Sequence, residues 1–409
     1  MQRQGFELTK NDTKMMQGLA VLAMVCLHLF DTLNFEGKYI PLVFFHGYPL
    51  IFYFAQLSDF CVMAFAFCSG YAHMTQYGKP HYYKRRLTGL LGVYLNFWII
   101  LVMFTVLSLL VGNGSSIPGD LQTFIGNFTT IHLSYNGAWW YLLTYALIVF
   151  SSPLLLRLSQ KTSKWKPVLV LVLMGLVYCA AYYERFSINS SNWFVYQFGL
   201  YGMTAVEYMI GSMACEYKVF SFLGNNWNRI FRNVLTKFGW AAILLIILLL
   251  VRTLVVPSLF FAPISGFIVL FLFRKMKKPK WFEKCFLTLG KHSTNIWLMH
   301  MFFYAYIFVG LVYRARFPIP ILLFMLAITL LVSVVINVII MMRIGFLPMN
   351  RTRDTYFRKN FVDMFPITDR RQKSVGMFLT NRQNVDMFLD AILRTGSNQW
   401  TSSRLLAQV

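Results

Sequence analysis

The chain has 409 residues, of which 57% are hydrophobic, 18% are aromatic and only 13% are charged. A water-soluble domain needs more polar surface than this, so the composition excludes an ordinary soluble protein and indicates a membrane protein. The net charge of +23 would suit a nucleic-acid-binding protein, but the distribution of that charge along the chain argues against one.

Long apolar stretches recur along the chain as far as residue 342. One membrane span needs about 20 mostly apolar residues, because each helical residue advances 1.5 Å through a hydrocarbon layer roughly 30 Å thick. The sequence therefore predicts an all-α, polytopic membrane helix bundle with about ten transmembrane helices, at 15–31, 51–75, 88–112, 139–156, 168–183, 199–216, 239–256, 258–273, 295–313 and 319–342. Two of these spans are short, and the pair around Pro257 could instead form one re-entrant hairpin.

Basic residues fall almost entirely on one side of the predicted spans. With the N-terminus inside, all but a few of the 38 Lys and Arg residues lie on the inner side, the exceptions being Lys38, Arg185, Arg252, Arg314 and Arg316. Cytoplasmic segments of membrane proteins are enriched in Lys and Arg. The charge therefore predicts cytoplasmic N- and C-termini and no nucleic-acid partner. We expect a multi-pass protein of the plasma or cytoplasmic membrane, in contact with membrane lipid.

Composition divides the chain into a transmembrane domain at 1–345 and a basic cytoplasmic C-terminal tail at 346–409. Within the tail, Val385–Leu393 has apolar residues at helical spacing. This segment either lies on the membrane surface as a helix or belongs to a loosely ordered tail.

The first span carries the most informative polar residues. Gln17 and His28 are eleven residues apart, which places them on one helix face and roughly 16 Å apart along the axis. Ionisable groups inside spans are functional candidates, because their burial in lipid is unfavourable. Asp31 follows one turn later and could hold the imidazole of His28 in one tautomer. Alternatively, His28 is structural and Asp31 is a loop residue.

Other polar residues allow two interpretations each. Glu207, midway through the sixth predicted span, has no obvious partner and serves either a structural hydrogen bond or a proton path. Trp139 and Trp140 lie where aromatic residues gather at membrane interfaces whatever the function. In the functional interpretation, one of the two tryptophans packs against a substrate.

Five stretches of the sequence are informative because of their order and spacing. They are Gln17–Ala20 with His28, Phe67–Tyr71, Tyr82–Leu87, Trp139–Leu143 with Ser152-Pro153-Leu154, and Asn295–His300. Together they resemble the acyltransferase 3 family of integral-membrane O-acyltransferases, over about residues 10–345. The sequence departs from the family at Gln17 and at Gly89, where a cation is usual.

The resemblance implies acyl transfer from an acyl-CoA, expected to be cytoplasmic acetyl-CoA, to a hydroxyl of a cell-surface or lipid-linked glycan. A sugar hydroxyl needs a base to take its proton, and we predict His28 as that base with Asp31 as its partner. We expect the CoA to contact Gln17, Lys84, Arg85, Arg86 and His300. We expect the acceptor to contact Trp139, Trp140 and Glu207. No metal is expected, and a separate extracytoplasmic protein could complete the reaction.

Two other functions remain open. A secondary transporter or a flippase for a glycan-related substrate would also have these spans, Glu207 and the polar, aromatic loop 113–138. A non-catalytic membrane scaffold with this fold would account for the missing cation at Gln17. The basic residues Lys84–Arg86 and 274–284 could likewise reflect topology alone.

Overall fold

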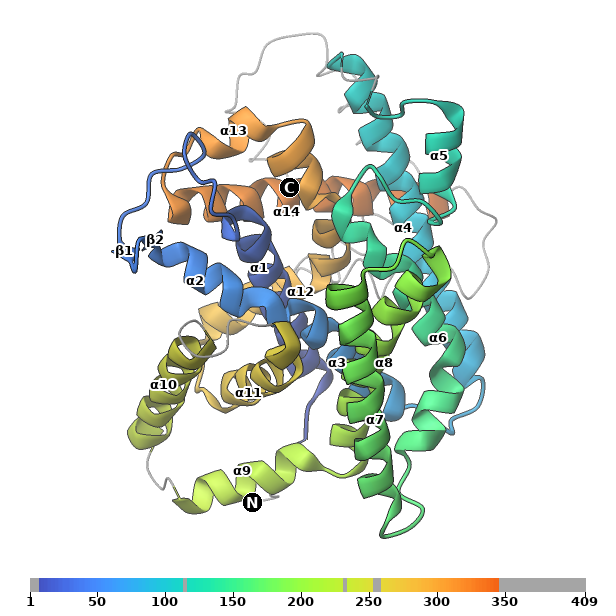
Figure 1. Cartoon of the computed structure of the whole chain (residues 1–409), viewed down its shortest axis with the longest axis vertical. Helices are drawn as coiled ribbons and strands as arrows, with labels where there is room; N and C mark the ends of the chain where they lie inside the picture. Colours follow the sequence, from blue (N-terminus) through green and yellow to red (C-terminus); the bar gives the residue numbers. More distant parts are fainter. Residues whose placement is uncertain (1–6, 113–115, 231–233, 253–258, 346–409) are drawn as a thin grey trace, which may run out of the picture. The chain divides into compact units, whose positions relative to one another are not determined.

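The computed structural model describes residues 7–112, 116–230, 234–252 and 259–345 (Figure 1). Met1–Asn337 forms one compact unit, and the residues from Val338 onward belong to a second. The predicted hairpin around Pro257, the tail at 346–409 and its segment Val385–Leu393 lie outside the described residues.

The described chain is almost entirely helical (Figure 1). The first helices are α1 (Lys10–Phe30), α2 (Leu50–Leu57), α3 (Cys61–Met74), α4 (Tyr82–Leu110), α5 (Leu121–Phe128), α6 (Trp140–Ser159) and α7 (Lys166–Tyr183). They are followed by α8 (Trp193–Glu216), α9 (Val219–Ile230), α10 (Val234–Leu250), α11 (Ala262–Lys275), α12 (Lys280–Met301), α13 (Val309–Tyr313) and α14 (Pro318–Gly345).

Short turns and one hairpin connect these helices. The turns are η1 (Ser58–Phe60), η2 (Gly137–Trp139), η3 (Glu184–Ile188), η5 (Leu259–Phe261) and η6 (Phe302–Tyr306). The strands of the described part are β1 (Phe44–Phe45) and β2 (Tyr48–Pro49), which pair antiparallel.

Six helical segments among the described residues are long and apolar enough to cross a membrane. They are Lys10–Phe30, Leu50–Met74, Tyr82–Leu110, Gly137–Ser159, Lys166–Ile188 and Pro318–Ile340. Each falls on a predicted span, which confirms the prediction of a polytopic α-helical membrane protein. The count of ten spans and the cytoplasmic placement of both termini stay predictions.

The predicted span 295–313 differs most from the observed helices. α12 begins fifteen residues earlier, at Lys280, and after Met301 the chain continues through the π turn η6 into the short α13. The first half of α12 carries several polar and charged residues on its surface, among them Lys280, Glu283, Lys284 and Lys291. Because these residues interrupt the apolar pattern, the start of the helix is not predicted from apolar runs.

α4 shows how a helix of this protein meets both lipid and protein. The buried residues of one face recur at helical spacing, among them Leu90, Phe97, Leu101, Phe104 and Ser108. The opposite face exposes large apolar residues, among them Leu91, Leu95, Val102, Val106 and Leu109. An apolar stripe of this length is unfavourable in water and is typical of a helix that faces hydrocarbon.

Two helix pairs touch backbone to backbone. A methyl group at Gly18 of α1 would collide with the carbonyl oxygen of Phe286 in α12, and one at Gly290 of α12 would collide with that of Lys14. Gly70 of α3 and Gly211 of α8 face neighbouring carbonyls of the opposite helix in the same way. Small residues allow such close approach in membrane proteins, so glycine fixes the shortest spacing between α1 and α12 and between α3 and α8.

A buried polar network joins α4, α12 and α14. The amide nitrogen of Asn96 donates to Asn295 Oδ1 at 2.8 Å, and Asn295 Nδ2 donates to Ser333 Oγ at 3.0 Å. Asn295 Nδ2 also donates to Asn337 Oδ1 at 3.0 Å, and His292 Nδ1 lies 2.8 Å from Ser333 Oγ. Satisfied polar groups in a low-dielectric interior define one arrangement of the helices, so this network fixes how α12 faces α4 and α14.

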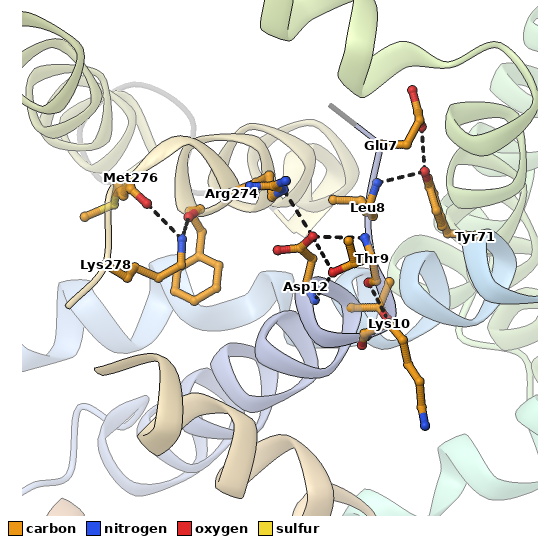
Figure 2. A network of polar contacts seen from close by, with 11 residues as sticks. Glu7, Leu8, Thr9, Lys10, Asp12, Tyr71, Arg274, Met276 and Lys278 are labelled. Carbon is orange, nitrogen blue, oxygen red and sulfur yellow. Dashed lines mark hydrogen bonds and ion pairs between the residues drawn. The ribbon is translucent and has the colours of Figure 1, made fainter. Parts of the chain in front are cut away.

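The start of α1 is held by side-chain contacts to three other helices (Figure 2). Thr9 and Asp12 form a capping box, in which Asp12 Oδ2 accepts from the backbone nitrogen of Thr9 at 2.9 Å. Asp12 also pairs with Arg274 of α11 at 3.3 Å. Glu7 accepts from the hydroxyl of Tyr71 in α3 and from the backbone nitrogen of Ser221 in α9.

Beside this anchor, Lys278 lies in the short connection between α11 and α12 (Figure 2). Its ammonium group donates to the carbonyl oxygens of Phe273 and Met276. Burial, reinforced by the positive charge of Arg274, lowers the pKa of Lys278 to about 8. Lys278 therefore serves to bind the last carbonyls of α11 rather than as a fully hydrated surface cation.

The Asp12→Ala variant is expected to lower the free energy of unfolding by about 1–2 kcal/mol, because it removes half of the capping box and the partner of Arg274. The thermal midpoint of the purified protein in detergent measures this change. The matched control is Asn11→Ala, since Asn11 is exposed in the same helical turn. Equal midpoints for the two variants would contradict an anchoring role for Asp12.

Candidate functional site

A cavity of about 590 Å³ lies among the helices. Its lining comes from α1, α3, α6, α7, α8 and α12, with single residues from α2, α4 and α11 and several from the connecting turns. A space of this size is typical of small-molecule and cofactor sites. Because its polar lining side chains are carried mostly on helices, the scaffold holds them in fixed positions.

One face of α1 forms a polar wall of this cavity. Gln17 and His28 both line it, as their spacing of eleven residues predicts. Lys14 lines the same wall three residues before Gln17, and its ammonium nitrogen lies 3.5 Å from the carbonyl oxygen of Gly290. A cation therefore lies on the cavity wall one turn from Gln17, where the sequence comparison pointed to a missing charge.

His28 is half-buried, and its imidazole makes no hydrogen bond with any residue in the described part of the chain. Asp31 lines the cavity too, but its described contact is a C-cap, in which its backbone N–H donates to the carbonyl of Leu27 at 2.8 Å. Within the ranges that the structure covers, no hydrogen bond joins Asp31 to His28. The orienting role of Asp31 stays a prediction.

Trp139 and Trp140 point in different directions. The Trp139 side chain is fully buried, stacks edge-on against Phe97 and donates from Nε1 to the carbonyl oxygen of Leu298 at 2.8 Å. Trp140 lines the cavity. Only Trp140 of the pair is therefore placed to contact a ligand there, and Trp139 ties the start of α6 to α12.

Arg185 of η3 and Glu207 of α8 also line the cavity. The Arg185 guanidinium sits 4.9 Å from the centre of the Trp140 ring and makes no ion pair with the described residues. Glu207 is only 4% exposed, and its Oε2 has no hydrogen-bond partner in the part of the chain that the structure describes. The cavity thus holds a cation over an aromatic ring and an acceptor oxygen that a polar ligand can satisfy.

An ion pair forms another part of the cavity lining. Arg252, which follows α10, forms a buried ion pair with Asp59 of η1, and both residues line the cavity. Other side chains also line the cavity but were not predicted as site residues from the sequence: Lys14, Asp59, Tyr141, Tyr145, Arg185, Arg252 and Trp297.

The predicted CoA contacts other than Gln17 do not line the cavity. Lys84 and Arg85 are exposed at the start of α4, whereas Arg86 is half-buried, donates to Gln76 Oε1 at 2.9 Å and lies over the Tyr82 ring. His300 is fully buried behind the cavity wall, with its ring centre 5.0 Å from that of His28. The structure therefore brings His300 to His28, leaves Lys84 and Arg85 on the surface and ties Arg86 to Gln76.

This geometry suits a reaction between two ligands that share one pocket. The His28 imidazole, which has no hydrogen-bond partner among the described residues, lines the cavity. The cations Lys14 of α1 and Arg185 of η3 line it too. No cluster of three or more His, Cys, Asp or Glu side chains that could hold a metal ion occurs among the described residues.

The fold defines a polytopic helical membrane protein with a cavity among its helices. The family model described as an acyltransferase domain (acyltransferase 3) matches residues 13–338, so the chain belongs to this family. It is an integral membrane acyltransferase by family, as the sequence resemblance predicted. No curated protein and no solved structure matches the chain.

Proposed function

We propose that the protein transfers an acetyl group from cytoplasmic acetyl-CoA to a hydroxyl of a cell-surface or lipid-linked polysaccharide. One observation carries the proposal: a single cavity contains the Lys14 and Gln17 end of α1, the His28 imidazole and the aromatic wall with Trp140. The membership in an acyltransferase family supports the reaction class. The acetyl group, the polysaccharide and the membrane side are the proposed details.

In the proposed reaction, His28 acts as a general base. It takes the proton of the acceptor hydroxyl while that oxygen attacks the thioester carbonyl carbon of acetyl-CoA. The new ester C–O bond forms and the C–S bond breaks, and the proton on His28 passes to the departing CoA sulfur. A positioned base typically contributes about 10²–10⁴-fold to such a step.

The donor would enter from the end of α1 that carries Lys14. Lys14 and Gln17 line the cavity there, and Arg274 lies beside the start of the same helix. The phosphates of CoA are anions that Lys and Arg bind well. The exposed Lys84 and Arg85 would hold the outermost phosphates, on the side predicted to be cytoplasmic.

The acceptor would bind against the part of the lining that carries Trp140, Arg185 and Glu207. Trp140 offers an aromatic ring, and Glu207 and Arg185 offer an acceptor and a donor for sugar hydroxyls. A sugar hydroxyl both donates and accepts hydrogen bonds, so one sugar ring can donate to Glu207 and accept from Arg185. A lipid-linked glycan would reach this wall through the membrane, or a separate extracytoplasmic protein would deliver the chain to it.

Inverted membrane vesicles supplied with acetyl-CoA labelled in the acetyl group test the proposal. We expect label in the glycan fraction of vesicles that contain the protein and none in vesicles prepared without it. No label transfer, together with uptake of a glycan substrate, would replace the proposal with a transporter or flippase. Neither activity would favour a non-catalytic scaffold.

The Arg85→Ala variant is expected to raise the apparent KM for acetyl-CoA about tenfold, which corresponds to the loss of one charged contact to phosphate. Its folded yield should not change, because Arg85 is exposed and its guanidinium makes no hydrogen bond with the described residues. Arg86→Ala, in contrast, should lower the folded yield in addition to raising the KM, because Arg86 donates a hydrogen bond to Gln76. Initial rates over a range of donor concentrations measure the KM.

Lys79→Ala is the control, since Lys79 is an exposed cation in the turn just before α4. An unchanged donor KM in Arg85→Ala would return Arg85 to a role in membrane topology alone.

A further inference from the structure

We propose that His300 positions His28. On the side away from the cavity, His300 accepts a hydrogen bond from the imidazole N–H of His28. This leaves the cavity-facing nitrogen of His28 unprotonated. This inference rests on the proposed acyl transfer, in which His28 is the base. It assigns to His300 a role that acts through another residue, away from the donor and the acceptor.

The hydrogen bonding of His300 fixes its tautomer. Its Nδ1 lies 2.8 Å from the carbonyl oxygen of Trp297. A carbonyl oxygen only accepts, so Nδ1 carries the hydrogen and Nε2 of the neutral ring carries a lone pair. That Nε2 is buried and has no hydrogen-bond partner among the residues that the structure describes. His300 therefore presents one hydrogen-bond acceptor that lacks a donor.

The ring of His28 lies close to that of His300 and can supply the donor. The two ring centres are 5.0 Å apart and the ring planes are inclined by 45°. At this separation one nitrogen of each ring comes within hydrogen-bonding reach when the rings turn edge to edge. The Tyr304 ring stacks against both, at 6.0 Å from His300 and 6.3 Å from His28, so it limits how the two imidazoles can turn.

The two histidines occupy different places relative to the cavity. His28 lines it, whereas His300 is 0% exposed and does not. An imidazole whose inner nitrogen donates to His300 has its other nitrogen directed to the cavity as a lone pair, which is the form a general base needs. Partners of this kind hold catalytic imidazoles in one tautomer in many enzymes.

The backbone contact between α1 and α12 supports the pairing. Gly18 faces Gly290 where the helices touch, and His28 and His300 each follow ten residues later. The helices therefore run in the same direction, and the contact that sets their spacing also sets the separation of the two rings. A neutral imidazole can serve here without adding a charge to the interior.

The test compares His300→Gln with His300→Leu in the labelled acetyl-CoA assay. Gln keeps an amide oxygen as acceptor and an N–H for the carbonyl of Trp297, whereas Leu fills similar space without an acceptor. We expect His300→Leu to lower kcat on the order of 10²-fold with donor KM within about twofold, because the base but no donor contact is affected. We expect His300→Gln to recover most of that loss.

Rates are taken per amount of folded protein, measured by gel filtration. If His300→Leu does not fold, His300→Met replaces it as a flexible side chain without an amide acceptor. Equal kcat values for the Gln and the apolar variant would overturn the positioning role while leaving the proposed function intact. A rise in donor KM with unchanged kcat would place His300 at the CoA instead. Absence of transfer by the unaltered protein would overturn both proposals.

Discussion

The His28→Ala variant is expected to lose roughly 10²–10⁴-fold of its acetyl-transfer rate, which is the usual contribution of a general base. The loss should appear in kcat, with little change in the donor KM, because the imidazole acts on the acceptor proton in the transition state. Folded yield should be retained, since His28 is half-buried and the proposed contact to His300 is a single hydrogen bond. Initial rates with labelled acetyl-CoA in vesicles measure the effect.

His132→Ala is the matched control, since His132 is exposed outside the cavity and its substitution by alanine keeps the Cβ that packs on Gly126. That variant should transfer acetyl groups at the rate of the unaltered protein. If His28→Ala transferred at the same rate as His132→Ala, a general-base role for His28 would be excluded.

The Gly290→Leu variant is expected to remove most of the folded protein, and Gly290→Ala to cost about 1–3 kcal/mol or more of stability. Any side chain at this position meets the carbonyl oxygen of Lys14. That atom belongs to the backbone and cannot rotate away, so α1 and α12 would have to separate. Yield after gel filtration and the thermal midpoint of Gly290→Ala measure the two effects.

Gly92→Ala in α4 is the control, because, apart from the neighbouring backbone of α4 itself, no atom of the described residues lies within 4 Å of a methyl group added there. It should raise stability slightly, since alanine is a better helix former than glycine by about 0.5–1 kcal/mol. If Gly290→Ala were as stable as Gly92→Ala, the contact between α1 and α12 would not require glycine.

The sequence predicted what depends on local pattern. Apolar runs of sufficient length gave most helices, and a spacing of eleven residues placed Gln17 and His28 on one face of α1. Lys14 lies on the same face, but it precedes the apolar run and was interpreted only as part of the basic inner side. Arg185 was noted only as an exception to that charge distribution, since nothing local places it over the Trp140 ring.

Contacts between distant segments were beyond what one sequence can give. Gly18 and Gly290 each resemble ordinary small residues of a helix, and only the fold brings them together. The neighbourhood of His28 and His300 follows from that contact and not from either local pattern. Trp139 and Trp140 could be expected to face different directions, because adjacent helical residues differ by about 100°, but the sequence does not say which one meets the cavity.

The glycine contacts also bear on how a large acceptor could be admitted. Two backbones in direct contact leave no layer of side chains that could be compressed or rearranged. The pairs α1–α12 and α3–α8 are therefore rigid. The cavity-lining rings of Tyr178 and Tyr182 in α7 instead pack against the Phe260 ring, and contacts between side chains rearrange more readily. Widening for a branched glycan would therefore come from these aromatic side chains, and the distance between the two histidines would stay constant while the acceptor changes.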